Sequence, residues 1–299
     1  MDFGRVPGKN LDAINFSLPK EPDWNSSILK GKSDTSPQVY LGCPQWGIKE
    51  WVGKIYPTGA KDAQFLELYA KQYNAVELNA THHRLYDTDA IKRWSAKAGS
   101  SDFKFCPKIY KGISHDNLLT DKQLVTDEFL RGIAAFEHHL GPVFIQLSDS
   151  FNPQRKEELF QFLASLPTHI SFFVELRHPA WFTAPHLYDL LTALNQLNIG
   201  LIITDTAGRR DCCHMHLTQT KAFIRFVANH HSSDFARIND WVDRISYWLN
   251  NGLTEVYFFI HVYKEVFSPE LTIYAVDRLN GACNLKLKKP VIIQPSLFD

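Results

Sequence analysis

The sequence predicts an α/β protein built as a single (β/α)8 barrel of the TIM type. From Val39 onward, short apolar runs alternate with longer amphipathic runs, and this rhythm is typical of β/α units. Eight strand-length runs occur in about 260 residues, close to the usual size of such a barrel. The first of these runs leads into GCPQWG, which fits neither a dinucleotide-binding nor a Walker loop. This disfavours a doubly wound sheet.

The eight expected strands are short runs rich in β-branched and aromatic residues, at 39–43, 75–79, 103–108, 143–147, 171–176, 200–204, 222–227 and 255–262. Most of them are separated by segments whose apolar residues repeat with the helical period, at 62–73, 89–99, 128–140, 155–166, 185–197 and 238–251. The connection at 205–220 shows no such period. We therefore expect the sixth β/α unit to be irregular.

Residues 1–37 differ in composition from the rest of the chain. They are mostly polar, prolines interrupt them, and they contain only scattered apolar residues such as Leu11 and Trp24. We interpret them as an N-terminal extension that lies on the main domain or is partly mobile. The predicted organisation is therefore an extension at 1–37 followed by one barrel domain at 38–299.

Composition narrows the class of protein. Lysine plus arginine and aspartate plus glutamate number 32 each, so there is no overall basic surface for non-specific nucleic-acid binding. The longest apolar runs, such as 256–260, are too short to span a bilayer, and the first residues do not resemble a signal peptide. Five cysteines without regular spacing favour reduced thiols. We expect a cytoplasmic protein with no membrane segment.

Strand alternation places several polar side chains inside the barrel. In the second strand Val76 and Leu78 would face the helices, so Glu77 and Asn79 would face the lumen. The same reasoning directs other polar residues inward, with Asp205 at the end of the sixth strand: Cys106, Lys108, Gln146, Glu175, Arg177, Arg225 and His261. They lie in or just after the carboxyl-terminal half of each strand, where barrel enzymes carry their sites. The alternative is an internal ion-pair network, but the cost of desolvation makes stability alone a poor reason for one.

The loops after the strands add further candidates. His115, next to Asp116, could act as a general acid or base. Trp46 and Trp51 could stack on a sugar or base, or simply pack the first loop. We take as candidate catalytic residues Glu77, Lys108, His115 and Glu175, and as candidate substrate-binding residues Asn79, Arg84, Gln146, Arg177, His178, Arg225 and Trp46.

The segment DCCHMH at 211–216 groups two thiols and two imidazoles. Structural zinc sites usually combine C-x2-C and H-x3-H spacings from two places, and adjacent cysteines on a strand point apart. We therefore assign no metal ligands there.

Several segments resemble, in order, those of the YecE-like family, which carries domain of unknown function 72. They are LGCPQWGIKEWVGKIYP, FLELYAKQYNAVELNATHHRL, RWSAKA with DFKFCPKIYKGISHD, GPVFIQLSDSF and FVELRHPAWF. The resemblance implies a TIM-barrel-like fold and no established reaction. It also implies family polar positions at Glu77, Asn79, Arg84, Lys108, His115, Gln146, Glu175, Arg177, His178 and Arg225. The sequence departs from the family pattern at residues 80–84, at Val227 and Ala228, and at His261.

Three functions remain open from the sequence. The first is an enzyme, of the hydrolase or of the lyase or isomerase type, that uses acid–base chemistry on a small phosphorylated or polyhydroxy substrate. This function requires no cofactor. The second is a phosphodiesterase of the endonuclease IV type that uses a divalent metal, with ligands drawn from Glu77, Glu175, Asp205, His261, His82 and His83. The third is a non-catalytic barrel that binds a nucleotide or nucleic acid.

Overall fold

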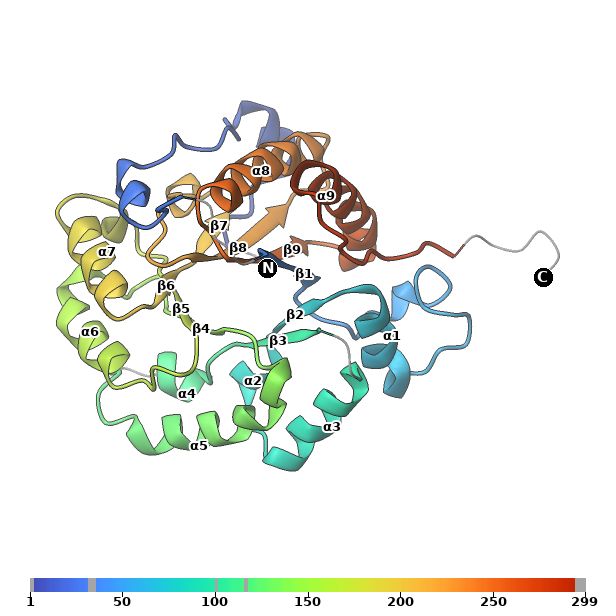
Figure 1. Ribbon diagram of the computed structural model, residues 1–299, viewed down its shortest axis with the longest axis horizontal. Helices are drawn as coiled ribbons and strands as arrows, with labels where there is room; N and C mark the ends of the chain where they lie inside the picture. Colours follow the sequence, from blue (N-terminus) through green and yellow to red (C-terminus); the bar gives the residue numbers. More distant parts are fainter. Residues whose placement is uncertain (1–2, 32–35, 100–101, 116–117, 294–299) are drawn as a thin grey trace.

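The computed structural model describes residues 3–31, 36–99, 102–115 and 118–293 (Figure 1). All eight expected strands are present, and the sixth is divided in two at Ile202. The named strands are β1 (Gln38–Cys43), β2 (Ala75–Leu78), β3 (Lys104–Pro107), β4 (Val143–Gln146), β5 (Phe172–Glu175), β6 (Gly200–Leu201), β7 (Ile203–Asp205), β8 (Lys221–Ala228) and β9 (Glu255–Val262).

The strands pair in parallel and form two sheets. One has six strands in the order β3-β2-β1-β9-β8-β7, and the other has three in the order β4-β5-β6. Isolated bridges join Lys108 with Phe144 and Phe105 with Leu140, and these connect β3 and its surroundings with the region of β4. The observed architecture is thus an α/β fold with mainly parallel strands, and no closed sheet is formed by the described residues.

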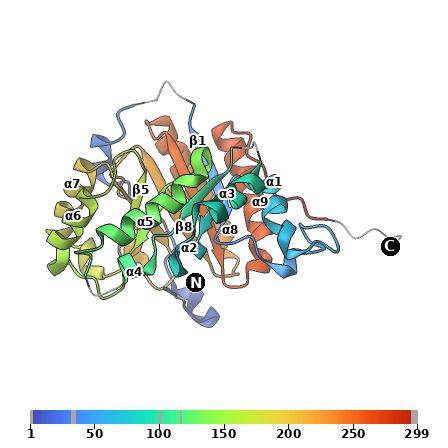
Figure 2. The ribbon, with the colours of Figure 1, turned by 90° about the horizontal axis from the view of Figure 1, so that it is seen from below.

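Helices surround the strands on the outside (Figures 1 and 2). They are α1 (Phe65–Gln72), α2 (Ala80–His83), α3 (Thr88–Ala98), α4 (Lys111–Ser114), α5 (Gln123–Ile133), α6 (Lys156–Ala164), α7 (His186–Gln196), α8 (Ser233–Asn250) and α9 (Ser268–Cys283). Short 3-10 turns are η1 (Gly8–Ala13), η2 (Asp23–Ser27), η3 (Lys49–Trp51), η4 (Asp62–Gln64), η5 (Ala134–His139), η6 (Pro153–Arg155), η7 (Pro179–Phe182), η8 (Arg210–Cys212) and η9 (Glu265–Phe267). The six expected helical segments are confirmed. The irregular sixth connection contains only η8 among its described helical turns.

Local sequence explains where α3 begins and ends. The Asp87 side chain accepts a hydrogen bond from the Ala90 amide at 2.7 Å and caps the start of α3, as acidic residues do at helix N-termini. The helix ends at Gly99, whose φ of 70° suits glycine. Among the described residues no helix has the length and apolar character needed to cross a membrane.

The core has two apolar clusters between strands and helices and a third on the inner face of the strands. The inner cluster consists of Tyr40, Ala75, Cys106, Phe144, Phe173, Ile202, Phe223, Tyr257 and Phe259. Gly42 lets β1 approach β2, because a Cβ atom there would overlap the carbonyl oxygen of Ala75. The inner cluster forms a layer beneath the polar residues at the carboxyl ends of the strands.

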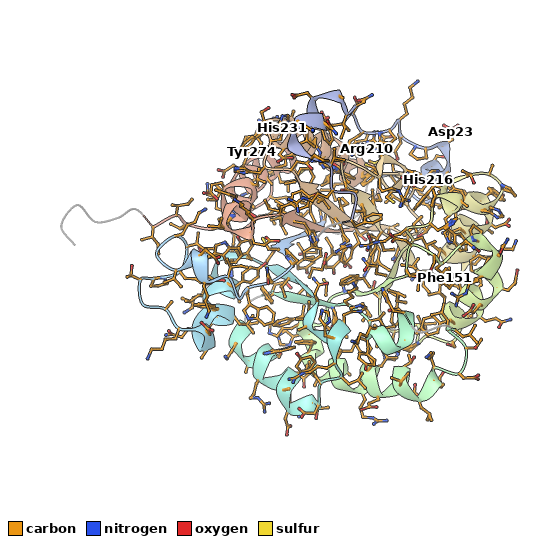
Figure 3. All side chains as sticks on the ribbon, turned by 180° about the vertical axis from the view of Figure 1, so that it is seen from behind. Asp23, Phe151, Arg210, His216, His231 and Tyr274 are labelled. Atoms are coloured by element: carbon orange, nitrogen blue, oxygen red, sulfur yellow. The ribbon has the colours of Figure 1, made fainter. Side chains whose placement is uncertain are left out.

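Residues 3–31 pack on the loop after β7 and on α8. The Asn25 side chain bonds to the Met215 carbonyl at 2.9 Å and to the Leu217 amide at 2.8 Å. Glu21 pairs with Arg244 of α8 at 3.0 Å. Figure 3 shows Asp23 of this segment on the same side of the molecule as His216 and Arg210. This packing carries the start of the described chain toward the carboxyl ends of the strands.

Candidate functional site

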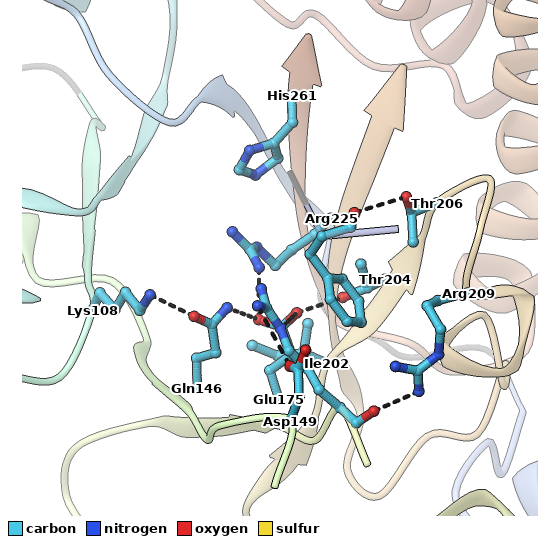
Figure 4. Close-up of polar contacts among 12 residues, drawn as sticks. Lys108, Gln146, Asp149, Glu175, Ile202, Thr204, Thr206, Arg209, Arg225 and His261 are labelled. Atoms are coloured by element: carbon cyan, nitrogen blue, oxygen red, sulfur yellow. Dashed lines mark hydrogen bonds and ion pairs between the residues drawn. The ribbon is translucent and has the colours of Figure 1, made fainter. Parts of the chain in front are cut away.

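The polar residues of the site stand one layer above the inner core. Each follows an inner-core residue by two positions, so both side chains point to the same face of the strand. The pairs are Ala75 and Glu77, Cys106 and Lys108, Phe144 and Gln146, Phe173 and Glu175, Ile202 and Thr204, Phe223 and Arg225, and Phe259 and His261. Figure 4 shows part of this layer, including Lys108, Gln146, Glu175 and Arg225. The layer brings together side chains from both sheets.

Arg225 is the centre of the layer. Its Nε and Nη2 atoms donate to the two carboxylate oxygens of Glu77 at 2.9 and 2.8 Å. Its Nη1 atom donates to Glu175 Oε2 at 2.6 Å. All three side chains are at most 2% exposed. A paired, planar guanidinium of this kind holds two carboxylates in fixed positions.

Both carboxylates are saturated with donors. Glu77 also accepts from Asn79 at 3.0 Å and from His261 Nε2 at 2.9 Å. Glu175 also accepts from Gln146 at 2.9 Å, Thr204 at 3.0 Å and Arg177 at 3.3 Å. Each oxygen thus accepts two hydrogen bonds, which matches its two lone pairs.

This environment keeps the two glutamates ionised. Burial acts to raise the pKa of Glu77, but the charge of Arg225 overcomes it and holds the pKa well below its usual range. Against the same burial, Arg225 and Arg177 lower the pKa of Glu175 to about 2. Burial and Arg225 lower the pKa of His261, so a neutral imidazole donates its Nε2 proton to Glu77. The carboxylates organise the site and are poorly suited to exchange protons near neutrality.

Lys108 is different, because its partner is a neutral amide. Its amine donates to Gln146 Oε1 at 2.6 Å, while Gln146 Nε2 donates to Glu175. No carboxylate lies within ion-pair distance of this amine among the described residues. The side chain is 8% exposed. Burial and the charge of Arg225 lower the pKa of Lys108 to about 8.

One histidine, His82, lies near Lys108, and a second, His115, packs against His82. Nδ1 of His82 bonds to the Ile109 carbonyl at 2.8 Å, so this nitrogen carries the proton and Nε2 is the acceptor. Burial and the charge of Lys108 lower the pKa of His82 to about 4. The His115 ring centroid is 4.8 Å from that of His82, and His115 Nδ1 bonds to Ser114 Oγ at 2.8 Å. The predicted residue His115 therefore belongs to a polar group that includes His82.

Arg177 connects this layer with the rim. It bonds to Glu175, and its guanidinium lies 4.0 Å from the centre of the Phe3 ring. Arg209 donates to the Arg177 carbonyl at 2.5 Å and approaches the same ring at 5.2 Å. Sequence reasoning did not select Phe3, Thr204, Thr206 or Arg209. Thr204 could have been found from alternation once Ile202 was known to face inward.

Three predicted binding residues lie apart from this group. Arg84 is exposed and stacks on Tyr86 at 4.2 Å. Trp46 packs edge-on against Trp94, with 5.6 Å between the ring centroids, beside the apolar core. His178 accepts a hydrogen bond from the Ala180 amide at 3.3 Å and caps η7. In this structure each of the three has a packing or capping role.

The expectation for Asp205 was wrong. It does not join Glu77 and Glu175 on the inner face of the strands but faces α8, where Trp241 donates to it at 2.8 Å and Arg237 pairs with it at 3.0 Å. Arg210 also bonds to this carboxylate. The sixth strand is interrupted at Ile202, which points inward with Thr204, so Ile203 and Asp205 point outward.

The side chains do not fit a divalent metal site. No group of three or more histidine, cysteine, aspartate or glutamate residues within the described part of the chain is placed to hold an ion. The oxygens of Glu77 and Glu175 already accept hydrogen bonds from Arg225, whose charge would repel a cation. In the segment 211–216, His214 instead bonds to the Ile202 carbonyl at 3.0 Å.

A family model described as "Protein of unknown function DUF72" matches residues 40–292. The UPF0759 protein YecE of Escherichia coli K12 is 30% identical over 256 residues, which are 78% of this chain and 89% of that protein.

Solved structures of two family members have a similar fold. A DUF72 protein from Thermotoga maritima is 19% identical, with a TM-score of 0.60 over 83% of this chain and all of that one. A DUF72 protein from Enterococcus faecalis is 16% identical, with a TM-score of 0.60 over 84% and 99% of the two chains. At these identities the likeness concerns the fold alone.

Proposed function

Because this chain belongs to the DUF72 family, whose description gives no reaction, we propose its function from the site. It is an enzyme that acts by acid–base chemistry on a small phosphorylated or polyhydroxy substrate, at the carboxyl ends of the strands. We also propose that the two sheets form one incompletely paired (β/α)8 barrel. The bridges between Lys108 and Phe144 and between Phe105 and Leu140 support this arrangement.

The observation that carries the proposal is the contact of Lys108 with an amide in place of a carboxylate. Gln146 stands between the amine and Glu175 and takes the position that an ion-pair partner would have. An amine that is buried among cations and lacks such a partner loses its proton more readily. Its pKa of about 8 suits a group that both accepts and donates protons near neutral pH.

The neighbours of Lys108 support proton transfer. Neutral His82 presents Nε2 as an acceptor, and His115 lies against it. In the proposed step, neutral Lys108 takes a proton from the substrate and the resulting ammonium returns it to the product. The histidines pass protons between this amine and solvent. The ionised carboxylates hold Arg225 and keep the positive charges in place throughout.

The charge pattern favours an anionic or hydroxyl-rich ligand. Lys108, Arg177 and Arg225 outnumber Glu77 and Glu175 in this layer. A phosphate would be attracted by the cations, and sugar hydroxyls would find both donors and acceptors. No comparable observation supports a metal-dependent phosphodiesterase or a nucleic-acid-binding module.

The test compares two lysines on one strand. Lys104 begins β3 and Lys108 directly follows its last residue, and the Lys104 amine donates to the His138 carbonyl at 2.7 Å. A panel of sugar phosphates and polyols is screened for turnover by NMR with wild type, Lys108→Met and Lys104→Met. Lys108→Met is expected to lose turnover by about 10²- to 10⁴-fold, the usual contribution of general acid–base groups, while Lys104→Met retains it. Equal turnover in all three proteins would contradict the proposed role.

A pH profile separates a proton-transfer role from a purely binding role. Gln146→Glu places a carboxylate against the amine and should raise the pKa of Lys108. The limb of the rate profile that rises with pH, centred near 8 in wild type because neutral Lys108 accepts the proton, should then move to higher pH. A limb that stays in place would argue against Lys108 as the proton-transfer group.

A further inference from the structure

The beginning of the described chain lies directly on the rim of the site. Thr206 Oγ1 donates to the carbonyl oxygens of Phe3 and Gly4, both at 3.2 Å. The Gly208 amide donates to the Gly4 carbonyl at 2.8 Å. The Arg5 guanidinium lies 4.6 Å from the centre of the Tyr263 ring. Residues 3–5, here called the strap, therefore extend from the loop after β7 to the end of β9.

Two glycines make this close approach sterically feasible. Gly4 has a φ of 69°, and a Cβ atom there would lie 2.5 Å from Thr206 Cγ2. A Cβ atom at Gly208 would lie 2.9 Å from the Gly4 carbonyl oxygen. A side chain at Gly4 would therefore both strain the backbone and collide with the rim.

The groups that hold the strap are those that bind anions in other proteins. A backbone amide, a hydroxyl and a guanidinium are common donors to phosphate oxygens. Here the carbonyl oxygens of Phe3 and Gly4 accept the hydrogen bonds that Thr206 and Gly208 could donate to an anion. The Phe3 ring covers one face of Arg177.

We propose that Thr206, Gly208 and Arg177 form a subsite for the anionic group of the substrate, and that the strap fills this subsite until the substrate displaces it. The inference rests on the proposed function and adds where the anion binds and what competes for that place. Thr206, Gly208 and Arg177 lie within the segment that matches the family, residues 40–292, while the strap lies outside it. The competing segment is thus separate from the part of the chain that resembles other members.

The competition has a measurable consequence. When only a fraction of molecules has the subsite open, the apparent dissociation constant rises by the inverse of that fraction. Releasing the strap should therefore tighten anion binding. If the subsite is open in about one molecule in ten, the gain is about tenfold.

The experiment compares two glycine variants with wild type. Gly4→Ala should release the strap, whereas a Cβ atom at Gly8 meets nothing within 4 Å, so Gly8→Ala is the matched control. Hydrogen exchange of the Gly208 amide reports whether the strap is seated, without any ligand. Calorimetry with inorganic pyrophosphate at low ionic strength reports whether the subsite is accessible.

We expect Gly4→Ala to lose protection of the Gly208 amide and to bind pyrophosphate about tenfold more tightly than wild type, with Gly8→Ala unchanged. Adding Arg177→Met to Gly4→Ala should abolish the gain. An exposed Gly208 amide without tighter binding, or a gain that survives Arg177→Met, would overturn the subsite.

The test is separate from that of the proposed function. If turnover depends on Lys108 but the pyrophosphate affinity is the same with and without a seated strap, the proposed acid–base function stands and the proposed subsite is overturned. Strap-dependent pyrophosphate binding without any turnover would do the reverse.

Discussion

Replacing Lys108 with methionine should stabilise the protein at neutral pH. Folding shifts the pKa of this amine from an ordinary 10.5 to about 8, which corresponds to a cost of about 3 kcal/mol in the charged form. Methionine avoids this cost but leaves Gln146 Oε1 without its donor, a loss of about 1 kcal/mol. The expected net gain at pH 7 is therefore about 2 kcal/mol.

The pH dependence of this gain is the distinctive part of the prediction. The unfolded chain holds the proton on Lys108 more tightly than the folded chain, so the wild type gains stability as pH rises from about 8 toward 10.5. The stability advantage of Lys108→Met over wild type, measured as the free energy of unfolding, should therefore be about 2 kcal/mol smaller at pH 9.5 than at pH 7.

Urea denaturation of wild type and Lys108→Met at both pH values measures this difference, since other titrating groups contribute equally to the two proteins. Lys104→Met is the control. It removes a hydrogen bond to His138 and an ion pair with Asp102 at 3.5 Å, so it should give no stabilisation. A Lys108→Met variant that is less stable than wild type by the same amount at both pH values would refute the reasoning.

Three further predictions concern the network and the fold. Glu77→Gln should cost about 3–5 kcal/mol in urea denaturation, because it leaves Arg225 partly uncompensated. Glu67→Gln, at an exposed pair with Lys71, is the control and should leave the urea midpoint essentially unchanged. Glu175 has a pKa of about 2 when folded and an ordinary value of 4.5, so the stability that its charge contributes should be present above about 4.5 and lost as pH falls toward 2. The stability difference between wild type and Glu175→Gln should narrow in that window, and a constant difference would contradict the assigned pKa. Gly42→Ala should lower the melting temperature strongly, since its Cβ would meet the Ala75 backbone, while Gly47→Ala, in open space, should not.

Much of the candidate site could be predicted because strand alternation is a local rule. Glu77, Lys108, Glu175 and Arg225 interrupt apolar strands two residues after an inner-core side chain. Period-two patterning then places them at one level. Which of them bond to one another depends on register and on the arrangement of distant strands. The pattern therefore grouped these residues but did not show that Gln146 separates Lys108 from Glu175.

Other features required tertiary information. Asp205 faces the helices because alternation places Ile202 and Thr204 on the inner face, and an apolar run alone does not show which of its residues face inward. The helix α9 was not among the expected segments, although it contributes Leu271, Val276 and Leu279 to the core. Pairing of Phe3 with Arg177 joins residues far apart in the sequence, and a polar segment at 1–37 offers no periodic signal for such a contact.

The central claim is that Lys108, which has no carboxylate ion-pair partner among the described residues, titrates near neutrality. Its most direct test is an NMR titration of the Lys108 side chain, assigned with Lys108→Met, in wild type and in Gln146→Glu. We predict a pKa near 8 in wild type and a distinctly higher value in Gln146→Glu. An ordinary lysine pKa, near 10.5, in both proteins would contradict the claim.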